Sequence, residues 1–273
     1  MRNLGGFTSG LTLCAQGGKA SVSLPPVAYR DADITAKEIT HIFRAGWFGI
    51  GRSDQVKSPG DFVTLDILDQ SLILLRDRDG ELRVLANTCR HRAARLLEGA
   101  GNCRGIRCPF HSWAYRLDGR LVSAPQMDGV EGFDRNNHAL VQYRVAQRLG
   151  FVFVCLNPDA PDLDDTLGDF AQVHAPWPLE GLVSTRRRET VVNCNWKAFI
   201  EVFNEYYHLP FVHRDSIDSI YAPPDPATPV SGAYVSQFGA TMGTGGLLQT
   251  EQDKALPRMP GLTGREAAGV RYS

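Results

Sequence analysis

Hydrophobic and polar residues alternate along much of the first half of the chain in short runs that are typical of β-strands. Asp79-Gly80 and Asp118-Gly119 are hairpin-turn dipeptides between such runs, and Gly150 separates two more. We therefore predict an all-β module over residues 44–157. Its strands are expected at residues 47–51, 62–68, 71–77, 81–87, 113–117, 120–125 and 140–157.

A longer periodicity marks two helices on either side of this module. Apolar residues recur at helical spacing over residues 34–43, which predicts an amphipathic helix with Thr35 as its N-cap. A second helix is predicted over residues 196–208, and Pro210 is expected to stop it. Residues 1–24 are dominated by glycine and small polar residues, so we expect an N-terminal arm there.

The second half of the chain is richer in proline, glycine and acidic residues. We predict a linker over residues 157–178, which carries one short helix near residues 167–173. Strands are expected at 186–196, 233–239 and 270–273, within loops that suit a cavity better than a packed layer. The predicted domains are residues 1–43, 44–157 and 158–273.

Composition narrows the function classes. The chain has 273 residues, of which 43% are hydrophobic, and its 29 basic and 30 acidic residues give a net charge of −1. This balance produces no field that would attract nucleic acid or an anionic membrane. The apolar run LTLCA is far too short for a signal or membrane segment, so we expect a cytoplasmic protein.

Candidate metal chemistry is concentrated between residues 89 and 111. Cys89-x-His91 and Cys108-x-x-His111 place two thiolates and two imidazoles on two short loops. Four such ligands could hold tetrahedral zinc, but the one-residue gap of the first pair is unusual for zinc. The pattern matches the Rieske [2Fe–2S] arrangement better, in which two cysteines bind one iron and two histidines the other. The other four cysteines are interpreted as free thiols: Cys14, Cys103, Cys155 and Cys194. For Cys103, a role as an alternative metal ligand is a competing interpretation.

A second group of ligand-type residues lies between positions 201 and 213. On a continuous helix Glu201, Glu205 and His208 would share one face, and a turn at Pro210 would let His213 converge with His208. Two histidines and a carboxylate can form the facial triad that holds Fe(II) with open positions for O₂ and substrate. A histidine among aromatic residues is more often a core group, but an upstream electron carrier favours iron, because the electrons need a destination. For Glu201, a surface role and a functional role are equally plausible.

At both sites the chain resembles the Rieske non-haem iron oxygenases, that is, the catalytic α subunits of ring-hydroxylating oxygenases. The resemblance rests on CRHRAARL and CPFHSWAYRLDGRL around the cluster loops, and on the acid-x₂-His-x₄-His order of the second site. It implies an α+β fold, with an all-β Rieske domain followed by a helix-grip (START-like) catalytic domain. The implied ligands are Cys89, His91, Cys108 and His111 for a [2Fe–2S] cluster, and His208 and His213 for Fe(II).

The acidic residue of the second motif is a bridge in this family and not an iron ligand. It accepts a hydrogen bond from an iron-binding histidine and reaches a Rieske histidine of the neighbouring subunit in a head-to-tail trimer. Aspartate is commonest there, so Glu205 departs from the pattern. A carboxylate of either length can fix the tautomer of a ligand histidine, and we expect Glu205 to be the catalytic bridge.

The resemblance also places the third iron ligand on an aspartate well downstream of His213, on a closing C-terminal helix. Only sixty residues follow His213, and none of their acidic residues fits that position. We therefore expect a catalytic domain that lacks its C-terminal part, with a mononuclear iron that is weakly bound or absent. The acidic residues considered are Asp215, Asp218, Asp225, Glu251, Asp253 and Glu266.

The function expected from these features is that of a Rieske oxygenase α subunit. It would receive electrons from a reductase or ferredoxin and use O₂ to hydroxylate an aromatic or related small organic substrate. The resemblance implies a homotrimer, with or without a small β subunit. Two alternatives remain open: demethylation of a quaternary ammonium compound, and a Rieske ferredoxin-type electron carrier without its own catalytic iron. The length of chain beyond residue 157 argues against the electron carrier.

Overall fold

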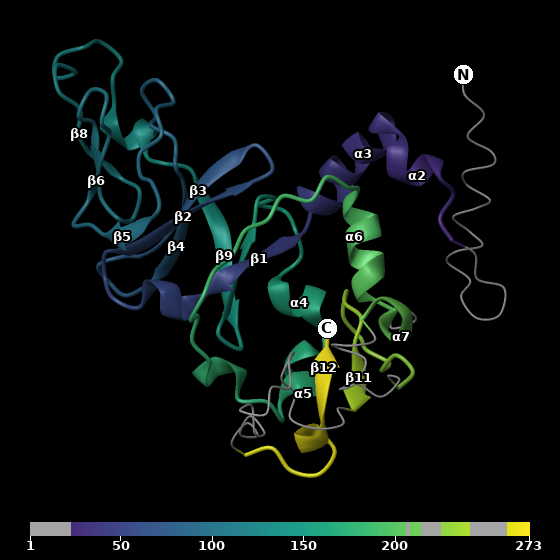
Figure 1. Cartoon of the computed structure of the whole chain (residues 1–273). Coiled ribbons are helices and arrows are strands. Elements are labelled where there is room, and N and C mark those ends of the chain that lie inside the picture. Colours follow the sequence, from purple (N-terminus) through teal and green to yellow (C-terminus); the bar gives the residue numbers. More distant parts are fainter. Residues whose placement is uncertain (1–22, 206–207, 214–224, 241–260) are drawn as a thin grey trace. The chain divides into compact units, whose positions relative to one another are not determined.

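The computed structural model forms two compact units (Figure 1). The β unit comprises residues 44–187 and 230–234, and the α6 unit comprises residues 1–43, 188–229 and 235–273. The structure describes residues 23–205, 208–213, 225–240 and 261–273. The predicted N-terminal arm therefore lies almost entirely outside the described residues.

An antiparallel sheet of seven strands forms the frame of the β unit, in the order β1-β10-β9-β4-β3-β2-β5. The predicted hairpin at Asp79-Gly80 joins β3 to β4, and Gly80 takes a φ of 85°, which a side chain would disfavour. The strands are β1 (Trp47–Arg52), β2 (Asp61–Ile67), β3 (Gln70–Arg76), β4 (Leu82–Ala86), β5 (Ala100–Asn102), β9 (Gln142–Arg148) and β10 (Phe151–Cys155).

Strand β3 separates the two apolar cores of this unit. Its four consecutive residues Leu72, Ile73, Leu74 and Leu75 are completely buried. Because side chains alternate across a strand, Leu72 and Leu74 pack into one core and Ile73 and Leu75 into the other. The second core also contains both cysteines of the candidate cluster.

A three-stranded sheet of β6 (Ile106–Arg107), β7 (Ala114–Tyr115) and β8 (Leu121–Ser123) stands beside the larger sheet in the β unit. The second predicted hairpin, at Asp118-Gly119, joins β7 to β8 as expected. Short helices complete the unit: 3₁₀ turns at Ser53–Val56, Arg135–His138 and Leu179–Gly181, and helices α4 (Leu163–Leu167) and α5 (Phe170–His174).

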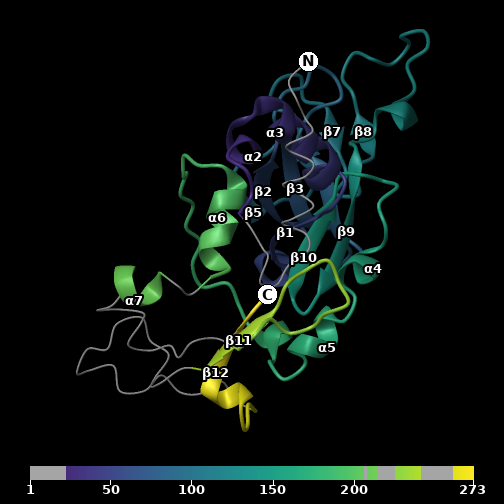
Figure 2. The ribbon, with the colours of Figure 1, turned by 90° about the vertical axis from the view of Figure 1, so that its right-hand side faces the viewer.

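In the α6 unit, helices α3 and α6 lie side by side in both views (Figures 1 and 2). The predicted strands near the C-terminus form an antiparallel pair, β11 and β12. Among the described residues, no helix has the length and apolar character needed to cross a membrane. The elements are α2 (Val27–Arg30), α3 (Ala32–Glu38), a π-helical turn (Ile39–Phe43), α6 (Trp196–Phe203), α7 (Leu209–Val212), β11 (Gln237–Ala240), a 3₁₀ turn (Glu266–Ala268) and β12 (Gly269–Tyr272).

The first predicted helix begins earlier than its apolar pattern indicated, and Thr35 is not its N-cap. Asp31 caps α3, because its side chain accepts hydrogen bonds from the backbone N–H groups of Asp33 and Ile34. Thr35 lies inside the helix and donates its hydroxyl to the carbonyl of Asp31. Asp31 is the stronger cap, since its carboxylate also carries a charge that suits a helix N-terminus.

Two other predictions about regular structure were wrong. The strand expected over residues 186–196 does not form, and Val191 is 99% exposed, so the alternation there has no second layer to pack against. The single helix expected over residues 167–173 is two helices, α4 and α5. Gly168 ends α4 with a φ of 53°, a backbone conformation that residues with a side chain rarely adopt.

Helix α6 is attached to α3 by a nearly buried ion pair. The Lys197 ammonium lies 2.6 Å from Glu38 Oε1, and the two side chains are only 10% and 12% exposed. The other oxygen of Glu38 accepts the indole N–H of Trp196 at 2.9 Å. This one carboxylate therefore holds the first turn of the helix that leads to the second candidate site.

We expect Glu38→Gln to lower the free energy of unfolding by about 3 kcal/mol, because it leaves the Lys197 ammonium nearly buried without a counter-charge. Urea denaturation followed by circular dichroism measures this change. The double variant Glu38→Leu/Lys197→Met, which removes both charges, should recover most of the loss. A single-variant effect below about 0.5 kcal/mol would place the pair among weak surface ion pairs.

Candidate metal centres

The two loops that carry the cluster motif share one backbone geometry. In each loop the cysteine N–H donates to the carbonyl five residues later, at 2.8 Å, and the cysteine carbonyl accepts from the N–H four residues later. The residue at that fourth position is left-handed in both loops, with φ values of 57° at Ala93 and 62° at Ser112. Neither is glycine, so each conformation carries some strain that the surrounding structure must offset.

Burial divides the four predicted ligands into two chemically distinct pairs. Cys89 and Cys108 are 3% and 2% exposed and belong to one apolar core. His91 and His111 are exposed, and their ring centroids are 4.7 Å apart. A buried cysteine pair and an exposed histidine pair fit a [2Fe–2S] cluster in which two cysteines bind one iron and two histidines the other.

A single tetrahedral zinc ion fits this arrangement less well. Such an ion needs four ligands that converge on one point. In the part of the chain that the structure describes, no three His, Cys, Asp or Glu side chains are grouped closely enough to hold one ion. The donor set fits two metal ions with two protein ligands each.

Aromatic rings hold both histidines in place. The indole of Trp113 stacks on His91, with ring centroids 5.0 Å apart and planes 11° apart, and Phe110 lies 4.0 Å from His111. Partial desolvation, and then the charges of His111 and Arg92, lower the pKa of His91. This shift favours the neutral ring, which is the form that binds a metal.

Tyr115 supplies a hydrogen bond to the thiolate side of the site. Its Oη lies 3.3 Å from Cys89 Sγ and accepts the backbone N–H of Arg90 at 3.1 Å. Burial, followed by the hydrogen bond to Cys89, raises the pKa of Tyr115, so the phenol remains protonated. A cysteine thiolate that binds a metal has no proton to donate, so in the assembled site the phenolic O–H would donate to the sulfur.

We expect Tyr115→Phe to lower the reduction potential of the predicted cluster by roughly 40–80 mV. The value follows from the loss of one hydrogen bond to a charged group, about 1–2 kcal/mol, at 59 mV per tenfold change for one electron. The cluster itself should persist, since no ligand is changed. Redox titration followed by circular dichroism measures the shift, and an unchanged potential would exclude this hydrogen bond as a determinant.

The second candidate site lies beyond α6, and here the predicted helix is wrong. Helix α6 ends at Phe203 and not at His208, with Asn204 as its C-cap. Glu205 follows the helix in irregular backbone, so Glu201, Glu205 and His208 do not share one helical face. Pro210 does not stop a helix, because it stands in the first turn of α7, where its missing N–H costs nothing.

The pairing expected of these residues nevertheless forms by another route. Glu205 Oε1 lies 2.5 Å from His208 Nδ1, and Glu205 Oε2 accepts the backbone N–H of His208 at 3.1 Å. The rings of His208 and His213 have centroids 5.4 Å apart. With Nδ1 of His208 bonded to the carboxylate, Nε2 is the nitrogen available for a metal, which fits a two-histidine iron site.

The other acidic residues considered for the second site do not complete a metal-binding group among the described residues. Glu201 accepts the hydroxyl of Tyr29 at 2.6 Å, a contact between helices that favours the structural role for this residue. The third iron ligand is not identified. Of the acidic residues considered, Asp225 and Glu266 are described and form no metal-type group with the histidines. The other four lie outside the described residues: Asp215, Asp218, Glu251 and Asp253.

The free-thiol prediction is confirmed for the cysteines outside the motif that the structure describes. Cys103, Cys155 and Cys194 form no disulfide, while Cys14 lies outside the described residues. Cys103 is half-buried against the core that contains the cluster cysteines. Burial raises the pKa of the Cys103 thiol and so disfavours the thiolate that a metal needs.

The motif analysis assigned no role to Trp113 and Tyr115. Their signal is present in the sequence: Trp113, Tyr115 and Leu117 alternate after the second loop, and all three are buried. This alternation indicates an inward-facing row of large side chains behind the cluster loops. It does not show that one of them reaches a ligand sulfur.

Two families match the chain, one in each half. Residues 46–134 match the family described as "Rieske [2Fe-2S] domain", and residues 170–269 match "Ring hydroxylating alpha subunit (catalytic domain)". The expected fold class and both expected cofactors are thereby confirmed.

Similar proteins agree with this assignment. The carnitine monooxygenase oxygenase subunit of Acinetobacter baumannii is 31% identical over 201 residues, which is 72% of this chain and 54% of that protein. The chlorobenzene dioxygenase subunit alpha of a Cupriavidus species is 32% identical, over 70% of this chain and 44% of that protein. A crystal structure of a quaternary ammonium Rieske monooxygenase matches with a TM-score of 0.76 and 29% identity, over 81% of this chain and 62% of that chain. The chain spans about half the length of the curated relatives it matches.

Proposed function

Because this chain belongs to the family of Rieske non-haem iron oxygenase α subunits, we propose that it is the oxygenase subunit of an enzyme that hydroxylates a small organic molecule with O₂. The observation that carries the proposal is the division of the four cluster residues into a buried cysteine pair and an exposed histidine pair. The catalytic-domain match over residues 170–269 counts against a pure electron carrier.

The proposed ligands follow from this geometry. Cys89 and Cys108 would hold one iron of the cluster, and His91 and His111 the other, while His208 and His213 would hold Fe(II). When bound, the cluster supplies single electrons, and the mononuclear iron supplies the site where O₂ is activated beside the substrate. A reductase or ferredoxin would be the electron donor.

The residues around the metals have positioning roles in this proposal. Trp113 orients His91 by stacking, and Tyr115 donates to Cys89. Glu205 holds the proton of His208 on Nδ1 and thereby keeps the other ring nitrogen ready for iron.

A head-to-tail homotrimer is part of the proposal. The exposure of His91 and His111 supports it, because a neighbouring chain could approach these rings directly. Glu205 is itself exposed, so its carboxylate could join His208 to a cluster histidine of a neighbour. Light scattering should give the mass of three chains, and a monomer would remove this route.

For the substrate, we favour a quaternary ammonium compound over an aromatic ring. Carnitine and quaternary ammonium monooxygenases stand among the similar proteins in both sequence and structure. The chlorobenzene dioxygenase subunit supports aromatic hydroxylation as the second candidate.

Metal content and turnover test the proposal together. Three irons per chain would support the mononuclear site, and two would contradict it. Turnover is measured with a surrogate reductase against glycine betaine, L-carnitine, benzoate and salicylate. Formaldehyde release from a betaine supports the first substrate class, and hydroxylated benzoate or salicylate the second. A protein with three irons that consumes O₂ with none of these would contradict both substrate assignments.

A further inference from the structure

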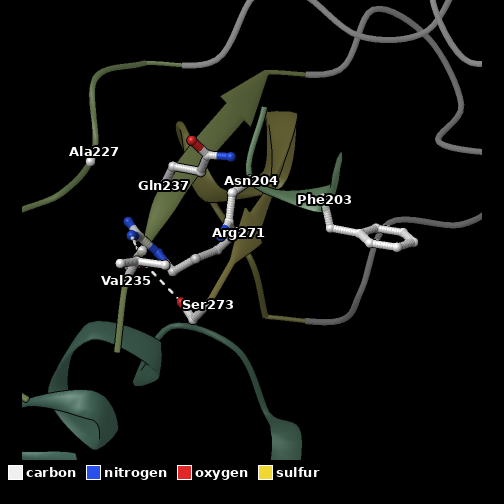
Figure 3. A pocket seen from close by; sticks show the side chains of 8 residues that line it. Phe203, Asn204, Ala227, Val235, Gln237, Arg271 and Ser273 are labelled. Carbon is white, nitrogen blue, oxygen red and sulfur yellow. Dashed lines mark hydrogen bonds between the residues drawn. The ribbon is translucent and has the colours of Figure 1, made fainter. Parts of the chain in front are cut away.

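The two units of the chain offer different kinds of recognition surface. The α6 unit contains a cavity of about 500 Å³ beside β11 and β12, a volume within the range of small-molecule sites (Figure 3). The cluster loops of the β unit instead present exposed basic and aromatic side chains. Side chains of this kind, displayed on an open surface, suit a protein partner better than a small molecule.

Arginine is concentrated in the two segments that carry the cluster motif. Residues 89–97 and 107–117 contain five arginines and no acidic residue, whereas the whole chain has a net charge of −1. The positive charge is therefore local to this part of the chain. The five residues are Arg90, Arg92, Arg95, Arg107 and Arg116.

Only two of these arginines are paired with a carboxylate. Arg95 lies 3.4 Å from Asp66, and Arg116 lies 3.5 Å from Asp118. The other three are exposed, and within the part of the chain that the structure describes they form no ion pair: Arg90, Arg92 and Arg107. Their charge is available to a partner.

The three unpaired arginines stand directly beside metal ligands in the sequence. Arg90 and Arg92 flank His91, and Arg107 immediately precedes the cysteine of the second loop. The ring centroids of His91 and His111 are 4.7 Å apart, so the two loops meet on the exposed side of the candidate cluster site. The unpaired positive charge therefore surrounds the route by which a partner would reach the cluster.

An exposed aromatic residue completes this surface. Phe110 is 61% exposed, and its ring lies 4.0 Å from that of His111. Arginine and aromatic side chains are enriched where proteins contact one another, and a buried aromatic ring often supplies much of the binding energy. A small anion could not cover this ring, but a protein could. We call Arg90, Arg92, Arg107 and Phe110 together the basic face.

An electron carrier is the partner that suits this position. The two cluster cysteines are 3% and 2% exposed, whereas both histidines are exposed, so a donor protein has its shortest approach to the cluster from the histidine side. A carrier with a negatively charged surface would be attracted to the basic face and would associate faster than a neutral one.

A neighbouring copy of this chain is a less suitable occupant of the basic face. The carboxylates of the α6 unit that lie closest in sequence to the second site are already engaged, Glu205 with His208 and Glu201 with the hydroxyl of Tyr29. The trimer contact considered above needs one cluster histidine, and it leaves the three guanidinium groups without counter-charges.

We propose that the basic face docks the electron donor, and that the donor carries carboxylates around its own redox centre. This inference rests on the proposed function and deepens it, because it specifies the docking surface and the charge of the partner. In the complex, one electron leaves the reduced donor and enters the oxidised cluster. The donor is thereby oxidised and the cluster reduced by one electron each, and no bond is made or broken.

Two small redox probes of opposite charge test the charge of the basic face. The reduced protein is mixed with ferricyanide, an anion, or with hexaamminecobalt(III), a cation, and oxidation of the cluster is followed by stopped-flow absorption. Added salt should slow the ferricyanide reaction and speed the hexaamminecobalt(III) reaction, because it screens an attraction in the first case and a repulsion in the second. Rates that do not depend on salt, or that show the opposite trend, would overturn the inference.

A plant-type ferredoxin, which is an acidic [2Fe–2S] protein, serves as the protein probe. The reduced ferredoxin is mixed with the oxidised protein, and the second-order rate constant for reduction of the cluster is measured. Arg92→Gln/Arg107→Gln should lower this rate constant roughly tenfold at low salt. Equal rate constants for the double variant and the wild-type protein would contradict docking at the basic face.

The β unit offers a matched control with the same change in charge. Arg116→Gln/Arg120→Gln also removes two guanidinium groups, but both of these pair with Asp118, at 3.5 and 2.9 Å. The control variant should leave the ferredoxin rate constant near that of the wild-type protein. A comparable loss in both double variants would mean a general effect of net charge and would reject a specific face.

Phe110→Ser separates the docking of a protein from the attraction of a small anion. Loss of the ring should slow reduction by ferredoxin several-fold, because the apolar contact is removed. The ferricyanide rate should not change, since all three arginines remain. An unchanged ferredoxin rate would mean that the surface attracts anions without docking a protein, and would overturn the choice of partner.

Light scattering distinguishes a donor from a neighbouring chain. Arg92→Gln/Arg107→Gln should have the same molecular mass as the wild-type protein. Dissociation of the variant into smaller species would identify the basic face as a contact between subunits and would reject donor docking.

Failure of this inference can be distinguished from failure of the proposed function, because reduction of the cluster is measured without substrate. Reduction by ferredoxin that depends on Arg92 and Arg107, in a protein that turns over no substrate, would uphold the docking surface and reject the oxygenase activity. Turnover in a protein whose cluster is reduced equally fast in all variants would uphold the activity and reject the docking surface.

Discussion

Cys108→Ser is expected to remove the [2Fe–2S] cluster and with it all turnover. The residue is 2% exposed, and a serine hydroxyl at this position would have to lose its proton within an apolar core to replace the thiolate. The visible absorption and the low-g EPR signal of the reduced cluster should disappear. The iron content should fall by the two irons of the cluster.

The matched control for this variant is Cys103→Ser. Cys103 is a half-buried thiol against the same core, and the sequence left it open as an alternative ligand. Its replacement should leave the absorption spectrum and the iron content unchanged. If Cys103→Ser abolished the cluster while Cys108→Ser retained it, the ligand assignment would be wrong.

Loss of the cluster should also destabilise the β unit. Cys89 and Cys108 are part of its buried core, so metal bound there contributes directly to folding. We expect a lower melting temperature for Cys108→Ser than for Cys103→Ser. Scanning calorimetry measures both on identical preparations.

The strands of the β unit could be predicted from the sequence because each has a strong local signal. Period-two alternation and Asp-Gly turns located the strands β2, β3 and β4 closely. All four residues of the run Leu72–Leu75 are apolar, so the sequence does not indicate which of them face which side of the sheet. The structure shows that they pack alternately into two separate cores. The left-handed residues Ala93 and Ser112 have no sequence signal, since glycine is the usual residue in that conformation.

The second site shows where local pattern reasoning fails. The residues of 196–208 follow helical spacing in the sequence, but the helix α6 covers only the first part of this range and ends at Phe203. The C-cap there is Asn204, a residue common at helix ends whose meaning depends on tertiary context. The pairing of Glu205 with His208, which the family resemblance implied, forms nevertheless, because two residues three apart can meet in a turn as well as in a helix.

Glu205→Gln tests the proposed connection between the two sites and should have the second largest effect. Glutamine keeps the length and can still accept the His208 Nδ1 proton, but it carries no charge to raise the basicity of the ring. Both metals should therefore remain, with unchanged iron content and cluster spectrum. Turnover should fall by roughly 10–100-fold, the range found when such a partner of a metal ligand is lost.

Glu201→Gln is the matched control, because it makes the same chemical change four residues earlier. Its carboxylate accepts from Tyr29 and makes no contact of the kind that Glu205 makes with His208. Its turnover should stay near that of the wild-type protein, with at most a small loss of stability.

A measurement apart from steady-state activity separates the electron path from metal binding. The pre-reduced protein is mixed with O₂ and substrate in a stopped-flow instrument, and reoxidation of the cluster is followed by its absorption. In Glu205→Gln this reoxidation should slow as much as turnover does, while the reduction potential of the cluster stays the same, since none of its ligands has changed. Slow turnover with fast reoxidation would place Glu205 after the electron transfer. Loss of the mononuclear iron would instead make its main role the support of His208, because the charged carboxylate would then be required for the ring to bind metal at all.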